Sequence, residues 1–237
     1  MTMQLDKLAN TFWQQGYLVI EDFFSAQTMD SLQSLILDHY GLDPEYEHEA
    51  AFLSKSATEV IPWFPQRSGV YAFDEIEHCA KMGTLTEVIL GKGWKALYCM
   101  TMFSKKGTKG QAWHQDCPPD DPQQFNLNRL VYTMDINDQV GGELLVMPGS
   151  HLAGKLPAGE VNEDFAEQLI LTPKKGTLVI IHGHTWHRVL PIKGEYRLST
   201  NYRAVPKNTP EDITDICVYR NMLYQFSTSK IVEERFI

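Results

Sequence analysis

The feature that most constrains the fold of this chain is a succession of short apolar runs between residues 95 and 204, separated by glycine and proline. Several of these runs alternate apolar and polar side chains, which is the pattern of a half-buried β-strand. Many short strands after a helical region predict a β-sandwich or barrel with helices on one face, and a double-stranded jelly roll is one such fold. The runs are residues 95–104, 129–136, 143–147, 168–172, 177–181 and 196–204.

The region before these runs has the residue spacing of helices. Leu5, Leu8 and Phe12 recur at helical intervals, and a serine at position 25 stands where a helix N-cap is expected. Prolines mixed with charged and aromatic residues over 42–70 predict irregular structure instead, with at most one helical turn. The predicted elements are a helix ending at Gly16, a strand at 17–20, a helix between Ser25 and Gly41, and a helix over 76–90.

Length and composition favour a single domain. The chain has 237 residues, of which 43% are hydrophobic, and this suffices for one well-buried core but is little for two. No internal repeat or linker-like boundary divides the sequence. We therefore expect one domain over 1–237, with a helical N-terminal part at 1–93, a jelly-roll core at 94–205 and a C-terminal tail at 206–237, all mainly β with flanking helices.

Composition also limits location and partners. The first 20 residues lack the basic start and apolar stretch of a signal peptide. The sequence also contains no run of about 18 apolar residues, which is the length needed to span a bilayer. The net charge is −9, and no basic cluster extends beyond Lys105, Lys106 and Lys109, which argues against a nucleic-acid surface. We expect a cytoplasmic protein that binds a small molecule and neither nucleic acid nor membrane; its oligomeric state is not defined by the sequence.

The cysteines do not form a metal or disulfide framework. They are widely scattered and contain no C-x-x-C pair, which fits reduced thiols in a cytosol. Any metal would therefore use other ligands. The cysteines are Cys79, Cys99, Cys117 and Cys217.

A histidine and an aspartate, His114 and Asp116, stand two residues apart in the segment Trp-His-Gln-Asp. On an extended strand this spacing points both side chains to one face, so the pair could bind one metal ion. A chain with eight histidines and many carboxylates also shows this spacing by chance. The alternative for the isolated pair is a surface histidine near a turn.

A second cluster contains three histidines in six residues, at positions 182, 184 and 187, directly after the apolar strand at 178–181. One of them, together with the H-x-D pair, would make two histidines and one carboxylate. This is the facial set that binds iron(II) and leaves three positions open. The others could cap the strand end and bond to the backbone, and we expect that role for at least one of them.

Arg197 and Ser199 follow in a predicted strand, again two residues apart and on one face. A guanidinium beside a hydroxyl is suited to a carboxylate, because arginine donates two parallel charge-assisted hydrogen bonds. The pair could bind the far carboxylate of 2-oxoglutarate. The alternative is an ordinary arginine on a solvated strand face.

Taken together, these motifs resemble the phytanoyl-CoA hydroxylase-like family of iron(II) and 2-oxoglutarate oxygenases, and the resemblance covers nearly all of residues 5–204. It is carried by the opening FWQQGYLVIEDFFS, the WHQD segment, the run GGELLVMPGSH at 141–151, the strand at 176–181, the distal histidine and the later arginine.

The resemblance implies a double-stranded β-helix that holds iron(II) through His114, Asp116 and His187, with Arg197 and Ser199 as the 2-oxoglutarate anchor. His184 and then His182 rank below His187 as the distal ligand. It implies consumption of 2-oxoglutarate and dioxygen, release of succinate and carbon dioxide, and hydroxylation of an unactivated carbon. Related halogenases replace the carboxylate ligand by a small residue, so Asp116 favours hydroxylation, or a desaturating or ring-forming variant.

Two parts of the site are less defined by the sequence. The strand at 97–103 lacks a convincing asparagine or glutamine for the near end of 2-oxoglutarate, which leaves Cys99, Thr101, Thr133 or Arg129. An arginine in the pocket would favour a substrate with a carboxylate, although aromatic residues at such spacings are more often core. The substrate-pocket candidates are Trp63, Phe64, Arg67, Tyr71, Arg129 and Trp186.

Two other classes of protein stay open at this point. One is a cupin-like metal enzyme that does not use 2-oxoglutarate, for which Arg197 would be dispensable. The other is a jelly-roll module without catalysis that binds a small ligand or partner, in which the histidines and aspartate are structural.

Overall fold

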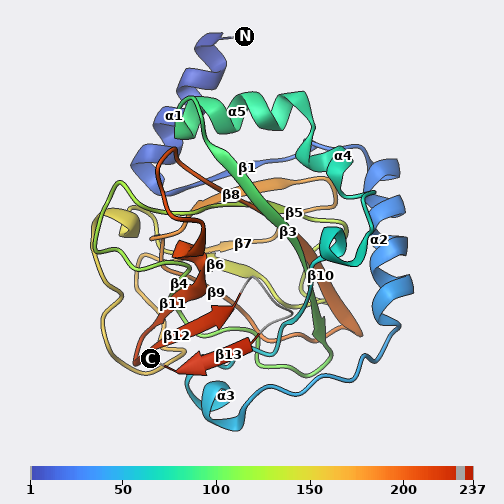
Figure 1. The fold of residues 1–237 in the computed structure, drawn as a ribbon. Coiled ribbons are helices and arrows are strands. Elements are labelled where there is room, and N and C mark those ends of the chain that lie inside the picture. The colour runs from blue at the N-terminus through green and yellow to red at the C-terminus, as the bar shows by residue number, and fades with distance from the viewer. Residues whose placement is uncertain (1, 228–232, 237) are drawn as a thin grey trace.

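The computed structural model describes residues 2–227 and 233–236, which form two antiparallel sheets with most of the α-helices on one side (Figure 1). The predicted class, mainly β with flanking helices, is confirmed. The first sheet has the strand order β1-β8-β5-β10-β3-β2. Its strands are β1 (Tyr17–Ile20), β8 (Leu178–His182), β5 (Leu127–Val131), β10 (Tyr196–Val205), β3 (Lys95–Lys105) and β2 (Ile61–Trp63).

The second sheet contains the shorter strands and the last part of the chain. Its order is β13-β12-β11-β4-β9-β6-β7 among the described residues. The strands are β13 (Glu233–Phe236), β12 (Met222–Ser227), β11 (Ile216–Tyr219), β4 (His114–Gln115), β9 (His187–Val189), β6 (Leu144–Val146) and β7 (Leu169–Leu171).

Four helices cover the outer face of the first sheet and enclose the larger hydrophobic core (Figure 1). They are α1 (Thr2–Gln15), α2 (Ala26–Tyr40), α4 (Asp74–Glu77) and α5 (Ala80–Leu90). Phe12, Met29 and Leu85 from three of them pack against strand residues such as Leu198 and Tyr202. Helix α3 (Ala50–Ser56) instead packs through Phe52 against Tyr219 and Tyr224 of the second sheet. The 3-10 helices are η1 (Pro65–Ser68), η2 (Ser150–Leu152) and η3 (Glu211–Asp215).

The helix ends follow the local sequence signals. Helix α1 ends directly before Gly16, which has a φ of +79°. The Ser25 hydroxyl accepts the backbone N–H of Thr28 at 3.1 Å and so caps α2, which Gly41 closes. These predictions are confirmed because caps and terminal glycines act within one helical turn.

Three predictions for the chain segments need correction. The single helix predicted over 76–90 is two helices, because His78 ends α4 and Cys79 has extended backbone before α5. The region 42–70 is not wholly irregular, since it contains α3, η1 and β2. Part of the predicted tail at 206–237 is η3 and three strands that extend the second sheet; residues 228–232 and 237 of that tail, and Met1, lie outside the described residues.

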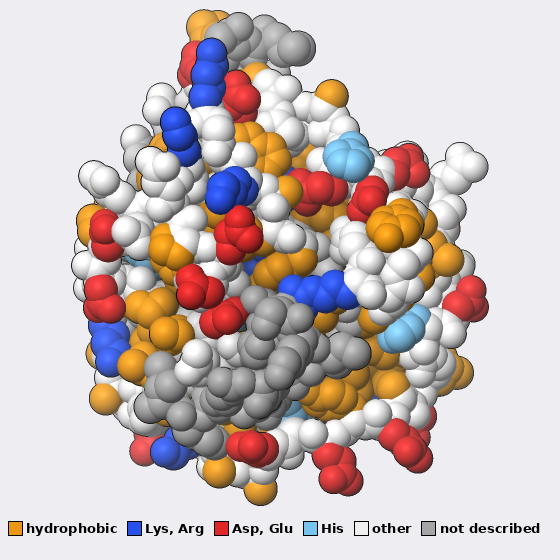
Figure 2. Space-filling model, viewed as in Figure 1, with side chains coloured by type: hydrophobic (Ala, Val, Ile, Leu, Met, Phe, Trp, Pro, Cys, Tyr) orange, Lys and Arg blue, Asp and Glu red, His pale blue; other side chains and the backbone are white. Residues whose placement is uncertain are grey.

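The visible surface carries charged side chains of both signs. Acidic and basic side chains are interspersed over the face shown in Figure 2, with hydrophobic side chains between them. Among the described residues, none of the helices has the length and apolar character needed to cross a membrane.

Candidate metal centre

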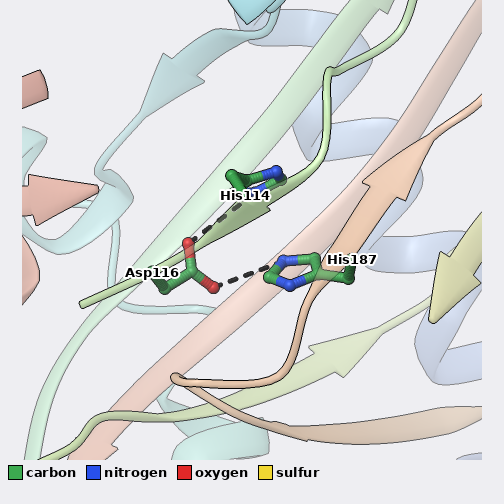
Figure 3. Close-up of side chains that lie close together, drawn as sticks. All are labelled: His114, Asp116 and His187. Carbon is green, nitrogen blue, oxygen red and sulfur yellow. Dashed lines mark ion pairs between the residues drawn. The ribbon is translucent and has the colours of Figure 1, made fainter. Parts of the chain in front are cut away.

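Two strands of the second sheet bring His114, Asp116 and His187 together (Figure 3). His114 on β4 lies directly opposite His187 on β9 in the antiparallel pairing, and their ring centroids are 4.2 Å apart. Asp116 follows β4 and points toward the same side as His114, as the spacing of two residues predicts. His114 and His187, which are 73 positions apart in sequence, thus meet through one strand pair.

The donor atoms of the three residues are close enough to share one ion. A ligand atom of each lies within 4.8 Å of the others, and no other such group occurs among the residues that the structure describes. His187 Nε2 is 3.4 Å from Asp116 Oδ2, and His114 Nε2 is 3.9 Å from Asp116 Oδ1. All three side chains are buried.

Backbone carbonyls fix which imidazole nitrogen faces the centre. The Nδ1 atoms of His114 and His187 lie 2.9 Å from the carbonyl oxygens of Ala112 and Thr185. A carbonyl can only accept, so each Nδ1 carries the proton and each Nε2 presents a lone pair. A histidine oriented in this way is the usual form of a metal ligand.

The protonation states also suit a metal. Burial, together with the neighbouring His187, lowers the pKa of His114 to about 4. Burial alone would raise the pKa of Asp116, but the positive charge of Arg203 and the two histidines outweigh it and hold that pKa at about 2. At neutral pH the site therefore presents a carboxylate with a neutral His114, and a ligand must be deprotonated to bind a metal.

The donor set fits a divalent first-row transition metal. Two imidazole nitrogens and one carboxylate oxygen on one side of an ion form the facial set found in non-haem iron(II) oxygenases, and the other side stays free for ligands. The structure therefore supports the combination predicted for these three residues.

Arg197 lies in the same cavity on β10 and is bonded only to uncharged groups. Its Nε donates to the Gly142 carbonyl at 2.8 Å, Nη1 donates to the Ser199 hydroxyl at 3.1 Å and Nη2 lies 3.5 Å from the Tyr132 hydroxyl. The arginine is buried, and none of these hydrogen bonds goes to a carboxylate, although buried Glu143 lies near enough to act on it electrostatically. A buried cation that no described carboxylate contacts directly is suited to an anionic ligand.

Gly142 provides the space that this arginine occupies. A Cβ atom at Gly142 would come within 2.3 Å of the Cδ atom of Arg197. The glycine also has a φ of +70°, which side chains rarely adopt. The residue is thus needed both for the turn before β6 and for the position of Arg197.

One cavity connects the metal centre and Arg197 and continues to an aromatic chamber. Tyr132 and Leu144 line it near Arg197. The chamber is formed largely by aromatic side chains from β3 and from segments before and after the jelly-roll core. These are Phe52, Phe64, Tyr98, Tyr219 and Phe226.

Three residues predicted for the site lie instead on the helix-covered face of the first sheet. Thr101 is bonded to the Tyr40 hydroxyl, Trp63 belongs to the helix-side core, and Arg129 donates two hydrogen bonds to Glu77 at 2.8 and 2.9 Å. None of the three lines the cavity. The expectation for them was wrong because strand residues alternate between faces, and these are on the outer one.

Other predicted residues are also outside the cavity lining. Thr133 is buried just after β5, Tyr71 is 66% exposed, and Arg67 stacks over the Phe64 ring at 4.3 Å. The indole N–H of Trp186 donates to the Gly154 carbonyl at 3.3 Å, in a small separate cluster with Phe165. Of the predicted substrate-pocket residues, Phe64 alone is among the described residues that line the cavity.

Sequence reasoning missed several polar residues of the cavity. Arg203 and Asn201 continue the alternation of Arg197 and Ser199 along β10, so the period of two was a signal for them. Asn128 on β5 and Gln111 before β4 also line the cavity. No local sequence pattern distinguishes these last two from other polar residues.

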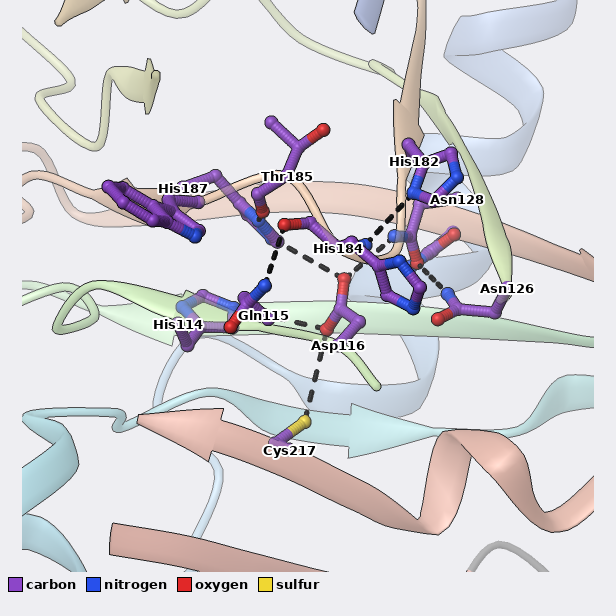
Figure 4. A network of polar contacts seen from close by, with 12 residues as sticks. His114, Gln115, Asp116, Asn126, Asn128, His182, His184, Thr185, His187 and Cys217 are labelled. Atoms are coloured by element: carbon purple, nitrogen blue, oxygen red, sulfur yellow. Dashed lines mark hydrogen bonds and ion pairs between the residues drawn. The ribbon is translucent and has the colours of Figure 1, made fainter. Parts of the chain in front are cut away.

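The other two histidines of the second cluster belong to a polar network beside the centre (Figure 4). His182 Nδ1 accepts the backbone N–H of His184 at 3.1 Å, and the His182 ring stacks on Phe125 at 3.9 Å. Neither belongs to the group of possible metal ligands. This agrees with the expectation that at least one of the three histidines bonds to the backbone.

The sequence over residues 12–196 matches the model of the family described as phytanoyl-CoA dioxygenase (PhyH). The chain belongs to this family. No curated protein sequence matches the chain.

Solved structures with a similar fold include several non-haem iron enzymes. The epimerase SnoN from nogalamycin biosynthesis, described as alpha-ketoglutarate dependent, has a TM-score of 0.70 at 16% identity, covering 93% of this chain and 87% of SnoN. HygX from Streptomyces hygroscopicus, with nickel and 2-oxoglutarate bound, has a TM-score of 0.67 at 16% identity, covering 86% and 88% of the two chains. The carbocyclase SnoK has a TM-score of 0.66 at 13% identity, with 90% and 85% covered. These likenesses show the fold, so the predicted jelly roll is confirmed.

Proposed function

We propose that this protein is an iron(II)- and 2-oxoglutarate-dependent oxygenase that hydroxylates an unactivated carbon of a small molecule. The observation that carries the proposal is that two histidines and one aspartate share a cavity with buried Arg197, whose hydrogen-bond partners are all uncharged. A metal set alone would suit many reactions, whereas the added anion site fits an oxidation that consumes a dicarboxylate.

Relatives in fold support the cofactor pair. SnoN was crystallised with Fe3+, alpha ketoglutarate and nogalamycin RO, and HygX with nickel, 2-oxoglutarate and hygromycin B. SnoN is named an epimerase and SnoK a carbocyclase, so the fold also serves outcomes other than hydroxylation. Asp116 retains the carboxylate in the metal set, which argues against halogenation; among the outcomes that remain, we propose hydroxylation as the simplest one.

The residues have separate tasks in this proposal. His114, Asp116 and His187 hold the iron, which when bound supplies the activation of dioxygen coupled to oxidation of 2-oxoglutarate to succinate and carbon dioxide. Arg197 binds the distal carboxylate of the cosubstrate through its guanidinium, and Ser199 holds one of the guanidinium nitrogens at 3.1 Å. The apolar walls exclude water from the reacting atoms.

The walls of the aromatic chamber limit the substrate. Asp116 is the one carboxylate among the described side chains that line the cavity, and it belongs to the metal set. A cationic substrate would find no counter-ion among these residues. We therefore propose a substrate whose oxidised part is apolar and carries no positive charge.

Anaerobic titration with iron(II) and 2-oxoglutarate tests the proposal. We expect the visible charge-transfer band of the iron chelate in the wild type and its loss in Asp116→Ala. Iron-loaded, folded protein that gives no band with 2-oxoglutarate would sink the proposal and favour the cupin-like enzyme. Absence of stoichiometric iron binding would favour the non-catalytic module.

A further inference from the structure

Both carboxylate oxygens of Asp116 are held by protein donors. Arg203 Nη2 donates to Oδ1 at 3.0 Å, and Asn128 Nδ2 donates to Oδ2 at 2.7 Å (Figure 4 shows the Asn128 side). Both donors come from the first sheet, whereas Asp116 follows a strand of the second sheet. The carboxylate plane is therefore fixed from two sides before any metal is considered.

The orientation of the Asn128 amide is itself determined. Its Oδ1 atom accepts from Asn126 Nδ2 at 3.1 Å and from Asn201 Nδ2 at 2.9 Å. With two donors on the oxygen, the amide nitrogen must face Asp116. Gly183 makes room for this network, since a Cβ there would come within 2.2 Å of Asn126 Oδ1.

Arg203 is an unusual neighbour for a metal ligand. It is 7% exposed and lines the cavity, and its Nε is buried without a hydrogen-bond partner. A guanidinium beside a divalent cation repels it, so this residue does not serve to raise the affinity for the metal. Its hydrogen bond to a single oxygen of Asp116 instead favours one geometry of the carboxylate.

The geometry of the carboxylate decides how many positions a metal has left. A carboxylate can bind a metal through one oxygen or through both. Binding through both would use a position that the facial set otherwise leaves open for the cosubstrate and dioxygen. Donors on both oxygens oppose this, because each then competes with the metal for a lone pair.

We propose that Arg203 and Asn128 are positioning residues that keep Asp116 a one-oxygen ligand and so preserve the open positions of the metal. This inference rests on the proposed function, because it concerns the same metal centre.

Cobalt(II) provides the test, because its visible d–d absorption reports coordination number without turnover. In Arg203→Met and in Asn128→Leu we expect the cobalt spectrum to change in the same direction. We also expect the affinity of the cobalt protein for 2-oxoglutarate to fall about tenfold or more, while the affinity for cobalt does not fall. Because Asn128 is uncharged, Asn128→Leu changes only the geometry of the Asp116 carboxylate, whereas Arg203→Met also removes a positive charge.

Arg220→Met is the matched control. Arg220 is 6% exposed and donates to Glu163 at 2.9 Å, but it does not line the cavity. This variant should keep the wild-type cobalt spectrum and 2-oxoglutarate affinity even if it unfolds at a lower temperature.

The outcomes separate the inference from the function. If the wild type binds cobalt and 2-oxoglutarate but Arg203→Met keeps both the spectrum and the affinity, the positioning role is wrong and the proposed function stands. If the spectrum changes equally in Arg220→Met, the effect is a general loss of packing, which also overturns the inference. If the wild type binds no 2-oxoglutarate in the presence of cobalt, both proposals fail.

Discussion

Arg129 and Arg197 are both buried arginines of the first sheet, but they lie on opposite faces and have different partners. Arg129 faces the helices and donates two hydrogen bonds to the Glu77 carboxylate. Arg197 faces the cavity, where its partners are a carbonyl and hydroxyls. The first arginine is bonded to a carboxylate of the protein, whereas the second is bonded to uncharged groups only, and for it we propose a ligand carboxylate as the direct partner. Burial and residue type alone therefore do not distinguish structure from function here; the charge of the partner does.

The largest effect on stability should come from breaking the pair on the helix face. In Arg129→Met we expect the free energy of unfolding to fall by about 3–5 kcal/mol, because Glu77 loses its counter-ion in a largely buried place. Urea denaturation measures this change. A double-mutant cycle with Glu77→Gln should recover part of the loss, and iron and 2-oxoglutarate binding should persist in the folded fraction. A loss below about 1 kcal/mol would show that the pair is not structural.

The same change on the cavity face should affect binding instead. In Arg197→Met we expect 2-oxoglutarate binding to weaken by about 2–5 kcal/mol, since the ligand carboxylate loses its charged partner. The free energy of unfolding should change by only about 1 kcal/mol, because removal of an unpaired buried charge offsets the lost hydrogen bonds. Calorimetric titration and urea denaturation of one preparation give both values. If Arg197→Met binds 2-oxoglutarate as tightly as the wild type, Arg197 does not bind the ligand and its role does not differ from that of Arg129.

A glycine next to Arg197 gives a smaller and more specific change. Gly142→Ala adds a Cβ against the Arg197 side chain at a residue with positive φ, and we expect a loss of about 1–3 kcal/mol in stability together with weaker 2-oxoglutarate binding. Gly69→Ala is the matched control, because Gly69 has a φ of +77° and nothing within 4 Å of a Cβ. If the two variants bind 2-oxoglutarate equally well, Gly142 does not position Arg197.

The smallest effect should be a pH dependence from the helix face. Burial, with the neighbouring His184 and His151, lowers the pKa of His182 well below its usual range. The stability that this neutral histidine contributes is present above the unfolded pKa of about 6.5 and is lost as the pH falls toward the lower folded pKa.

Urea denaturation between roughly pH 7 and pH 5 measures this loss, whose slope is at most about 1.4 kcal/mol per pH unit for one histidine. His182→Asn keeps an acceptor for the His184 N–H but does not titrate, so its slope should be shallower. His78→Asn, at an exposed histidine, should keep the wild-type slope. Equal slopes in all three proteins would contradict the role of His182.

The features that the sequence predicted well are those set within a few residues. The spacing of His114 and Asp116, and that of Arg197 and Ser199, places each pair on one strand face without knowledge of the rest of the fold. Caps at Ser25 and Gly16 are local in the same way. Membership in the family, carried by the order of these motifs, agrees with the match over residues 12–196.

The features that were missed depend on contacts between distant segments. Thr101 and Arg129 were predicted for the cavity, but strand register turns them to the helices, while their neighbours Met100 and Asn128 line the cavity. The pairing of Tyr219 with His114, which brings the C-terminal strands to the metal centre, joins residues 105 positions apart and has no local signal. Face and register are properties of the assembled sheet.

The most direct test of the central claim is a crystal structure of the protein with nickel(II), as an inert substitute for iron, and 2-oxoglutarate. We expect anomalous density for one nickel ion bound by His114 Nε2, Asp116 and His187 Nε2, with the distal carboxylate of 2-oxoglutarate on Arg197. Nickel at another place, or 2-oxoglutarate that leaves Arg197 without a charged partner, would contradict the assignment of the cavity face to binding.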